Sequence, residues 1–99
     1  MEHKPLELHA EAERDYFDAL DWYRSRSMPA AEKFEEAFWK AIQTVEAFPQ
    51  RWPIYFARFR RYTLHEFPFS IVYREEPSRT FVLAVAHGRR RPGYWKQRG

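Results

Sequence analysis

The first residues of the chain alternate between hydrophobic and polar side chains. Leu6 and Leu8 have the same parity within residues 4–9, which predicts a short strand. Pro5 places this strand at a sheet edge or at its own start, because proline cannot donate a hydrogen bond to a ladder. From residue 10 onward the hydrophobic spacing is that of a helix. Its apolar stripe consists of Ala12, Tyr16, Ala19, Leu20 and Tyr23.

A second helical pattern follows a break at residues 25–29. Ser27, two positions before Pro29, is expected to be the N-cap, because its hydroxyl can accept a hydrogen bond from a backbone N–H of the first turn. The apolar stripe consists of Ala30, Phe34, Ala37, Phe38, Ala41, Val45 and Phe48, and the pattern ends at Pro49. Two consecutive amphipathic helices predict a helical hairpin.

The second half of the chain has the character of β-structure. Residues 48–59 form a connection interrupted by prolines and rich in aromatic residues. Three runs then predict strands over 60–67, 69–75 and 80–87, joined by short antiparallel connections. Residues 81–86 are apolar on both parities, which is typical of a central strand covered on two sides. The order β-α-α-β-β-β predicts an α+β fold, with the helical hairpin packed on an antiparallel sheet.

Length and composition bound the class of protein. The 99 residues fit one domain over 1–99, and 44% hydrophobic with 31% charged residues is a globular balance. The absence of cysteine excludes disulfides, thiolate zinc sites and thiol catalysis. The N-terminus is too polar for a signal peptide, and the longest apolar run is far shorter than the ~20 residues of a membrane span. We therefore expect a cytoplasmic protein without a membrane partner.

Charge is divided unevenly along the chain. Residues 1–50 contain six Lys or Arg and eleven Asp or Glu, whereas residues 51–99 contain eleven and three. The basic half predicts an anionic partner, although ion pairing between the two halves would also explain the division. The many arginines suit bidentate contacts with carboxylates or phosphates.

Candidate chemistry is confined to basic and aromatic residues near the C-terminus. The four histidines lack metal-ligand spacing, and the glycines at 88, 93 and 99 form no phosphate loop, so neither a metal nor a cofactor is expected. The remaining constellation is Arg60, Arg61, His87, Arg89, Arg90, Arg91, Tyr94 and Trp95. Metal-independent RNA cleavage could use His and Tyr for proton transfer and Arg for the phosphate charge. Tyr94 or Trp95 could stack on a base, whereas His87, which shares strand parity with Val85, could equally be a buried structural histidine.

Four segments match a known family. They are AERDYFDALDWYRSR at 12–26, AFPQRWP at 47–53, RRYTLHEFPFSIVYRE at 60–75 and VLAVAHGRRRPGYWKQR at 82–98. The more specific signatures are an arginine seven residues before FPF, and His87 followed by Arg90, Tyr94 and Trp95. Over residues 5–98 the chain resembles RelE/ParE-type toxins of bacterial type II toxin–antitoxin modules, above all the ParE-like branch, often called plasmid stabilisation proteins. The resemblance implies the same order of elements as the hydrophobic periodicity.

The resemblance implies a growth-inhibiting toxin held inactive by a cognate antitoxin. ParE-like members poison DNA gyrase, whereas RelE-like members cut mRNA on the ribosome and tend to use lysines on the sheet. This chain has no lysine between Lys40 and Lys96, which favours gyrase as the target and a protein that is not an enzyme. The alternative is a metal-independent, ribosome-dependent mRNA endoribonuclease, and a third possibility is a non-toxic nucleic-acid-binding module.

The residues expected to be needed for toxicity and target binding are Arg60, Arg61, His87, Arg90, Tyr94 and Trp95, and the first five are also the candidate catalytic residues of a nuclease. Alignment with the family motif selects Arg60. Strand parity instead groups Arg60 with Tyr62, so that Arg61 points to the open face of the sheet if Tyr62 faces the helices.

Three aromatic residues lie off or at the flank of the apolar stripes of the helices. Phe17, Trp22 and Trp39 are therefore either partly covered surface residues or contacts for a protein partner. Because antitoxins of this family wrap their toxins with a C-terminal segment, we expect these three residues to bind the antitoxin. The basic C-terminal half would suit an acidic antitoxin segment.

Overall fold

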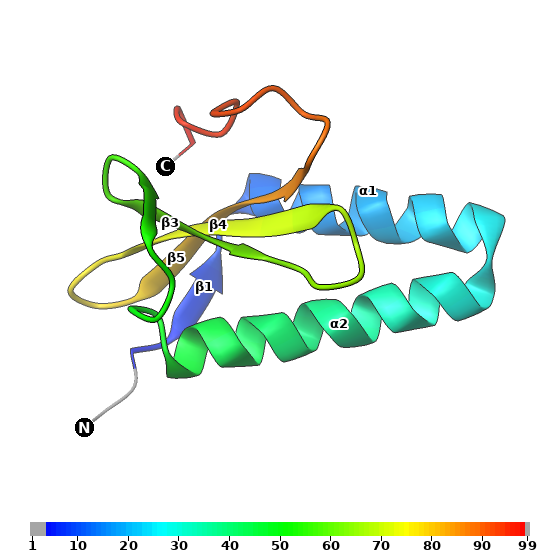
Figure 1. Ribbon diagram of the computed structural model, residues 1–99, viewed down its shortest axis with the longest axis horizontal. Coiled ribbons are helices and arrows are strands. Elements are labelled where there is room, and N and C mark those ends of the chain that lie inside the picture. The colour runs from blue at the N-terminus through cyan, green and yellow to red at the C-terminus, as the bar shows by residue number, and fades with distance from the viewer. Residues whose placement is uncertain (1–3, 99) are drawn as a thin grey trace.

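A hairpin of two long helices lies against a five-stranded sheet, as Figure 1 shows. The computed structural model describes residues 4–98. The elements are β1 (Leu6–Leu8), α1 (Ala10–Arg26), α2 (Met28–Ala47), β2 (Ile54–Phe56), β3 (Phe59–Thr63), β4 (Phe69–Glu75) and β5 (Thr80–His87). The α+β fold with a helical hairpin on the sheet is confirmed.

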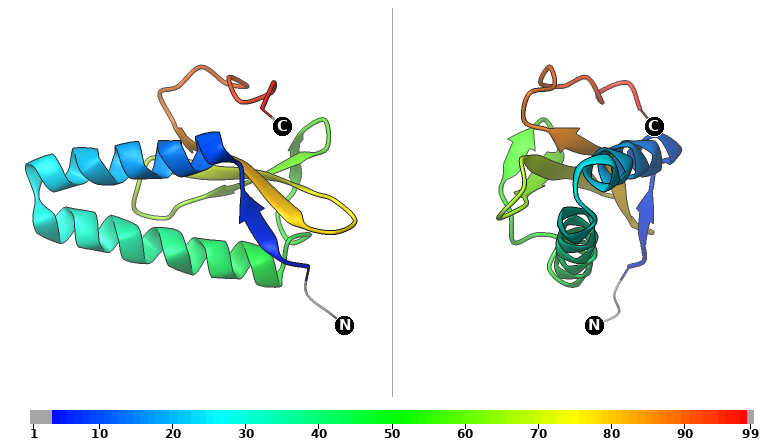
Figure 2. Two further views of the ribbon diagram at one scale, coloured as in Figure 1. Left: turned by 180° about the vertical axis from the view of Figure 1, so that it is seen from behind. Right: turned by 90° about the vertical axis from the view of Figure 1, so that its right-hand side faces the viewer.

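Local capping sets the ends of the helices. His9 is the N-cap of α1, where its Nδ1 accepts a hydrogen bond of 3.0 Å from the backbone N–H of Glu11. Ser27 ends α1 and begins α2: its N–H donates to the carbonyl of Tyr23 at 2.8 Å, and its Oγ accepts from the N–H of Ala30 at 3.2 Å. The helical break is thus one residue wide, and the helices run side by side in opposite directions (Figure 2). Neither helix within residues 4–98 is long and apolar enough to cross a membrane.

The sheet has the strand order β1-β5-β4-β3-β2 and is antiparallel except for the β1–β5 pair. β2 corrects the sequence prediction, which placed a connection over residues 48–59. Ile54 and Phe56 pair with Arg60 and Phe59 of β3, but the three-residue run is too short and too close to Pro53 to show a periodicity. The predicted strand over 60–67 ends at Thr63, because the N–H of Leu64 closes a loop by donating to the carbonyl of Phe69 at 2.9 Å.

A β-bulge changes the direction of the side chains along β5. Tyr73 is paired with Val82 and the preceding Val72 with Ala84, so that Leu83 is an extra residue on β5. Val85 therefore packs in the same helix-side core as Val82, although the two positions differ in parity. Strand parity alone would place residues 81, 83, 85 and 87 on one face, but the extra residue shifts every later side chain to the opposite face.

Two apolar clusters cover the two faces of the sheet. The helix-side core contains Phe34 and Phe38 of α2 and Tyr16 of α1, packed on Ile71 and Val82. A smaller cluster on the opposite face consists of Phe59, Val72, Phe81, Leu83, Ala84 and Trp95. β5 is thus covered on both sides, as its doubly apolar sequence predicted.

Candidate functional site

The C-terminal segment, residues 88–98, leaves the end of β5 and turns back over the sheet face that the helices do not cover (Figures 1 and 2). We call this segment the tail. Trp95 anchors it: the indole is only 2% exposed, and its ring centroid lies 4.8 Å from that of Phe59. A ring buried in this way cannot stack on a base. The structure therefore contradicts the expected stacking role of Trp95 and makes it a core residue.

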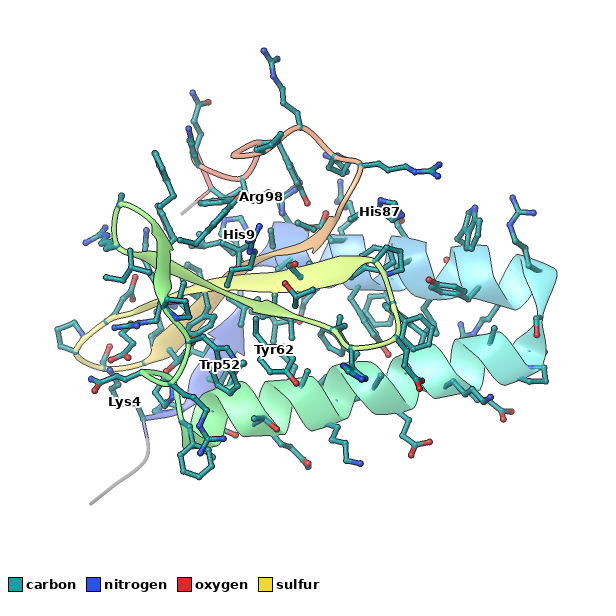
Figure 3. The ribbon with its side chains drawn as sticks, viewed as in Figure 1. Lys4, His9, Trp52, Tyr62, His87 and Arg98 are labelled. Atoms are coloured by element: carbon teal, nitrogen blue, oxygen red, sulfur yellow. The ribbon has the colours of Figure 1, made fainter. Side chains whose placement is uncertain are left out.

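A carboxylate on α1 holds the tail from the other side. Oδ2 of Asp15 accepts hydrogen bonds from Nη1 of Arg98 at 2.7 Å and from the Tyr94 hydroxyl at 3.3 Å, and Oδ1 accepts from Nη2 of Arg98 at 3.3 Å. The side chains of Asp15 and Arg98 are only 10% and 13% exposed. Figure 3 shows the Arg98 side chain between the ribbon of the tail and the sheet. This bidentate pair is of the strong, charge-assisted kind.

The same two side chains complete the edge of β5. β1 covers this edge only as far as the bond from the N–H of His9 to the carbonyl of Val82, at 2.8 Å. Beyond it, Asp15 accepts from the N–H of Val85 at 3.1 Å, and Nη1 of Arg98 donates to the carbonyl of Leu83 at 3.0 Å. Side chains thus satisfy the backbone groups that a longer β1 would have paired.

Tyr94 connects this buried cluster to the surface. The guanidinium of Arg90 lies 3.9 Å and that of Arg98 4.9 Å from the centre of its ring. Burial, followed by the negative charge of Asp15, raises the pKa of Tyr94 to about 12. The Tyr94 hydroxyl therefore donates to Asp15 and is a weaker acid than an ordinary tyrosine.

His87 lies at the end of β5, where the tail begins (Figure 3). Its ring meets that of Phe69 edge to face at 4.9 Å, and its Nδ1 accepts a hydrogen bond of 2.9 Å from the N–H of Arg89. The proton of the neutral imidazole is consequently on Nε2. This geometry agrees with the interpretation of His87 as a partly buried, hydrogen-bonded histidine.

The two adjacent arginines of β3 lie on opposite faces of the sheet. Arg60 is on the helix side, where its Nη1 donates to the carbonyl of Trp52 at 2.5 Å and its Nε is 3.9 Å from Oε1 of Glu75. Arg61 is exposed on the tail side, with its guanidinium 4.0 Å from the ring centre of Tyr55. Strand parity therefore selected the arginine on the tail face. Arg60, which the family motif selected, lies on the opposite face, away from the other candidate residues.

Tyr62 explains why Arg60 points to the helices. The ring centroids of Tyr62 and Trp52 are 4.7 Å apart, and both rings pack against the helix-side core, as Figure 3 shows. Side chains two apart on a strand share a face, so Arg60 must lie beside Tyr62.

A cavity of about 100 Å³ brings together five of the six residues predicted for toxicity and target binding. They are Arg61, His87, Arg90, Tyr94 and Trp95. Within residues 4–98, Arg61, Arg89, Arg90 and Arg91 form no ion pair with a carboxylate, whereas Arg79 pairs with Glu7 and Arg98 with Asp15. Internal pairing thus explains part of the uneven charge, and the remaining positive charge is exposed around this cavity.

The helical aromatics are exposed as their positions predicted. Phe17, Trp22 and Trp39 are 55%, 52% and 47% exposed. Phe17 and Trp39 flank the buried ring of Tyr16, at centroid distances of 5.1 and 5.8 Å. Trp22 lines a cavity of about 390 Å³ whose opposite wall includes His87 and Arg90. The aromatic helix surface and the basic tail therefore meet at one cavity.

Sequence reasoning missed Asp15. Asp15 lies three residues after Ala12 and four before Ala19, and both alanines are buried, so it falls on the apolar stripe of α1. A carboxylate at such a position is a signal for a buried partner. Within the described part of the chain, no group of three or more His, Cys, Asp or Glu side chains is placed to hold a metal.

Comparisons with known proteins identify the family and agree with the fold. A family model described as the ParE toxin of the type II toxin–antitoxin system, parDE, matches residues 6–92. A solved structure, the chromosomal ParDE toxin–antitoxin system from P. aeruginosa, is similar with a TM-score of 0.65 and 21% sequence identity, over 86% of this chain and 96% of that one. No curated protein matches the chain. The structural likeness, at this identity, concerns the fold.

Asp15→Asn should lower the free energy of unfolding by about 2–3 kcal/mol, because the change weakens charge-assisted bonds and leaves the Arg98 guanidinium with only the more distant carboxylate of Glu11, at 3.9 Å. Urea denaturation measures this loss. Asp18→Asn, one turn further on α1, removes the same charge from an exposed side chain and should change stability by less than about 0.5 kcal/mol. Equal effects of the two substitutions would contradict a special role for Asp15.

Tyr94 should ionise at a higher pH than an ordinary tyrosine. Its raised pKa means that the folded protein keeps a proton that the unfolded chain releases above pH 10, so this contribution to stability is complete below pH 10 and is lost as the pH rises through about 12. Absorbance at alkaline pH should show delayed tyrosine ionisation, part of which disappears in Tyr94→Phe. Tyr73, with a pKa also raised to about 12 by burial, should account for a further late component in both proteins. Unchanged titration of Tyr94→Phe would refute the assignment.

Proposed function

The chain belongs to the ParE toxin family of type II toxin–antitoxin systems, and from this premise we propose that it arrests growth by poisoning DNA gyrase until a cognate antitoxin neutralises it in the cytoplasm. The observation that supports a binding function most directly is the exposed cationic surface. Arg61, Arg90 and Arg91 line one cavity and Arg89 flanks it, all without carboxylate partners among residues 4–98. Exposed arginines of this kind suit an acidic surface of a target protein.

The geometry favours binding over ribonuclease chemistry. Cleavage of RNA without a metal needs a group that accepts a proton and another that donates one. The Tyr94 hydroxyl is engaged with Asp15, and Nδ1 of His87 is engaged with the backbone of Arg89. Both transfers would then depend on Nε2 of His87. The absence of lysine between Lys40 and Lys96 also favours binding over RNA cleavage, because the RelE-like ribonucleases tend to use lysines on the sheet.

The antitoxin is expected to bind the helical hairpin through Phe17, Trp22 and Trp39. These rings are about half exposed, and large exposed aromatic residues are frequent anchors of protein interfaces. The cavity beside Trp22 extends to His87 and Arg90. An antitoxin segment that covers Trp22 and has acidic residues beyond it would therefore also cover the target-binding arginines.

Arg90→Ala and Arg61→Ala should relieve growth inhibition, because each removes an exposed charge from the target-binding surface. A loss of about 1.4 kcal/mol for each corresponds to about tenfold weaker target binding. Colony counts after induction measure the effect, together with a DNA-damage reporter and the integrity of cellular mRNA. We expect the unmodified chain to activate the reporter and to leave mRNA intact.

Arg14→Ala is the matched control, since Arg14 is an exposed arginine on α1 whose side chain is 73% accessible. It should remain fully toxic. Rapid ribosome-dependent mRNA cleavage that His87→Gln abolishes would replace gyrase poisoning with the endoribonuclease alternative. Full toxicity of Arg90→Ala would refute the assignment of this surface.

Trp22→Ser and Trp39→Ser should each weaken antitoxin binding by at least about 30-fold, which corresponds to the ~2 kcal/mol of an interface hot spot. Calorimetry with the product of the neighbouring gene measures the affinity. Phe48→Ser serves as the control, because Phe48 is 50% exposed but lies at the end of α2 against Arg51. Equal loss in all three variants would argue against a binding site at the two tryptophans.

A further inference from the structure

Two small cavities adjoin where the tail meets the hairpin formed by β2 and β3. The cavity of about 100 Å³ contains Arg61 and Arg90, and a second one of about 150 Å³ lies between Phe56 and Lys96. Both are lined by Tyr55, Pro92 and Trp95, so they lie side by side and share these three residues as a common wall. We call the two cavities together the hairpin furrow.

The furrow is positively charged along its length. Its cationic lining residues are Arg61, Arg90, Arg91 and Lys96, with His87 at one end, and none of its lining residues is acidic. These four cations form no ion pair within residues 4–98. Like charges gathered in a concave surface repel one another and attract an anionic ligand.

The aromatic rings at the furrow are already covered by cations. Arg61 lies 4.0 Å from the ring centre of Tyr55, Lys96 lies 4.1 Å from that of Phe56, and Arg90 lies 3.9 Å from that of Tyr94. The ring of Phe56 is also parallel to that of Phe59, at 6.4 Å between centroids. Each cation covers one face of its ring, while Tyr55 and Phe56 stay 37% and 43% exposed. The covered faces are closed to base stacking, which favours carboxylates over nucleobases as ligands.

Backbone conformation keeps the furrow in shape. Gly93 has φ +81°, and a Cβ at this position would collide with the Lys96 side chain that lies over it. Glycine thus allows Lys96 to reach Phe56. On the other side, Ala57 at the tip of the hairpin has φ 49°, a left-handed conformation that is unfavourable for a residue with a Cβ. Strain of this kind is often found at functional sites.

The hairpin also exposes apolar surface. Ile54, Tyr55 and Phe56 are 56%, 37% and 43% exposed, although together they make up all of β2. Three consecutive exposed apolar residues on an edge strand favour association with another chain. A ligand for the furrow must therefore offer apolar contact in addition to negative charge.

We propose that the hairpin furrow binds an extended acidic segment of a protein partner, with carboxylates on Arg61, Arg90 and Lys96 and apolar side chains against Tyr55 and Phe56. The inference rests on the proposed function, in which Arg61 and Arg90 contact the target. It extends that contact surface to β2 and to Lys96. The class of ligand is a carboxylate-bearing peptide, and single-stranded nucleic acid is the competing outcome of the test.

The test uses the full chain and three fluorescent probes of equal length. These are a peptide of four Glu–Ala repeats, the same peptide with Gln in place of Glu, and single-stranded oligothymidylate. Fluorescence anisotropy at fixed ionic strength should show binding of the Glu–Ala peptide and much weaker binding of the other two. Arg61→Gln and Lys96→Gln should each weaken Glu–Ala binding about 3- to 5-fold, and the double variant about tenfold or more.

Arg14→Gln and Lys33→Gln are matched controls, because they remove the same charges from exposed positions on α1 and α2. Their affinity for the Glu–Ala peptide should stay within twofold of the unmodified chain. Equal weakening in all four single variants would show a general charge effect and overturn the proposal. Tighter binding of oligothymidylate with the same residue dependence would assign the furrow to nucleic acid.

The outcome for the furrow is separable from that for the toxin. If the Glu–Ala peptide fails to bind while Arg90→Ala still relieves growth inhibition, the furrow proposal fails and the proposed function stands. If the chain does not inhibit growth but the peptide binds with the expected dependence on Arg61 and Lys96, the furrow proposal stands and the proposed function fails.

Discussion

The carboxylate of Asp15 accepts hydrogen bonds from a strand, a tyrosine and an arginine, and the course of the tail depends on these bonds. A charge with a tenth of its surface exposed is costly to desolvate, and the bidentate Arg98 offsets that cost. Arg98 in turn donates to the carbonyl of Leu83, so the pair joins α1, β5 and the C-terminal residues. Tyr94 is held between Asp15 and Arg90, which connects the buried pair to the exposed arginines.

The sheet separates two kinds of surface. On one side the helical hairpin buries its apolar stripes and leaves Phe17, Trp22 and Trp39 exposed. On the other side Trp95 fixes a short tail whose arginines remain at the surface. The cavity beside Trp22 extends around to Arg90. A partner bound to the helices would therefore lie next to the residues proposed to bind the target, which gives antitoxin binding a direct physical route to neutralisation.

The arginines fall into two groups with different surroundings. Arg79 and Arg98 pair with Glu7 and Asp15, and thus join the basic half of the chain to the acidic half. Arg61 and Arg90 lie over aromatic rings, which support the planar guanidinium without neutralising it. The second group remains available for a ligand. The charge imbalance of the sequence therefore has both of the origins considered for it, internal pairing and an exposed cationic surface.

The sequence by itself determined the helical hairpin and the strands β4 and β5, because period and capping are local properties that short stretches of chain express on their own. Ser27 and the doubly apolar residues 81–86 are examples. Strand parity placed Arg60 and Arg61 on opposite faces, but which face each takes depended on the packing of Tyr62 against the helix-side core. Only the tertiary structure decided the course of β2, the burial of Trp95 and the role of Asp15, since each depends on a partner distant in sequence. The bulge at Leu83 belongs with these: it reverses the parity of every later β5 residue, and pairing with β4, not the composition of β5, sets its position.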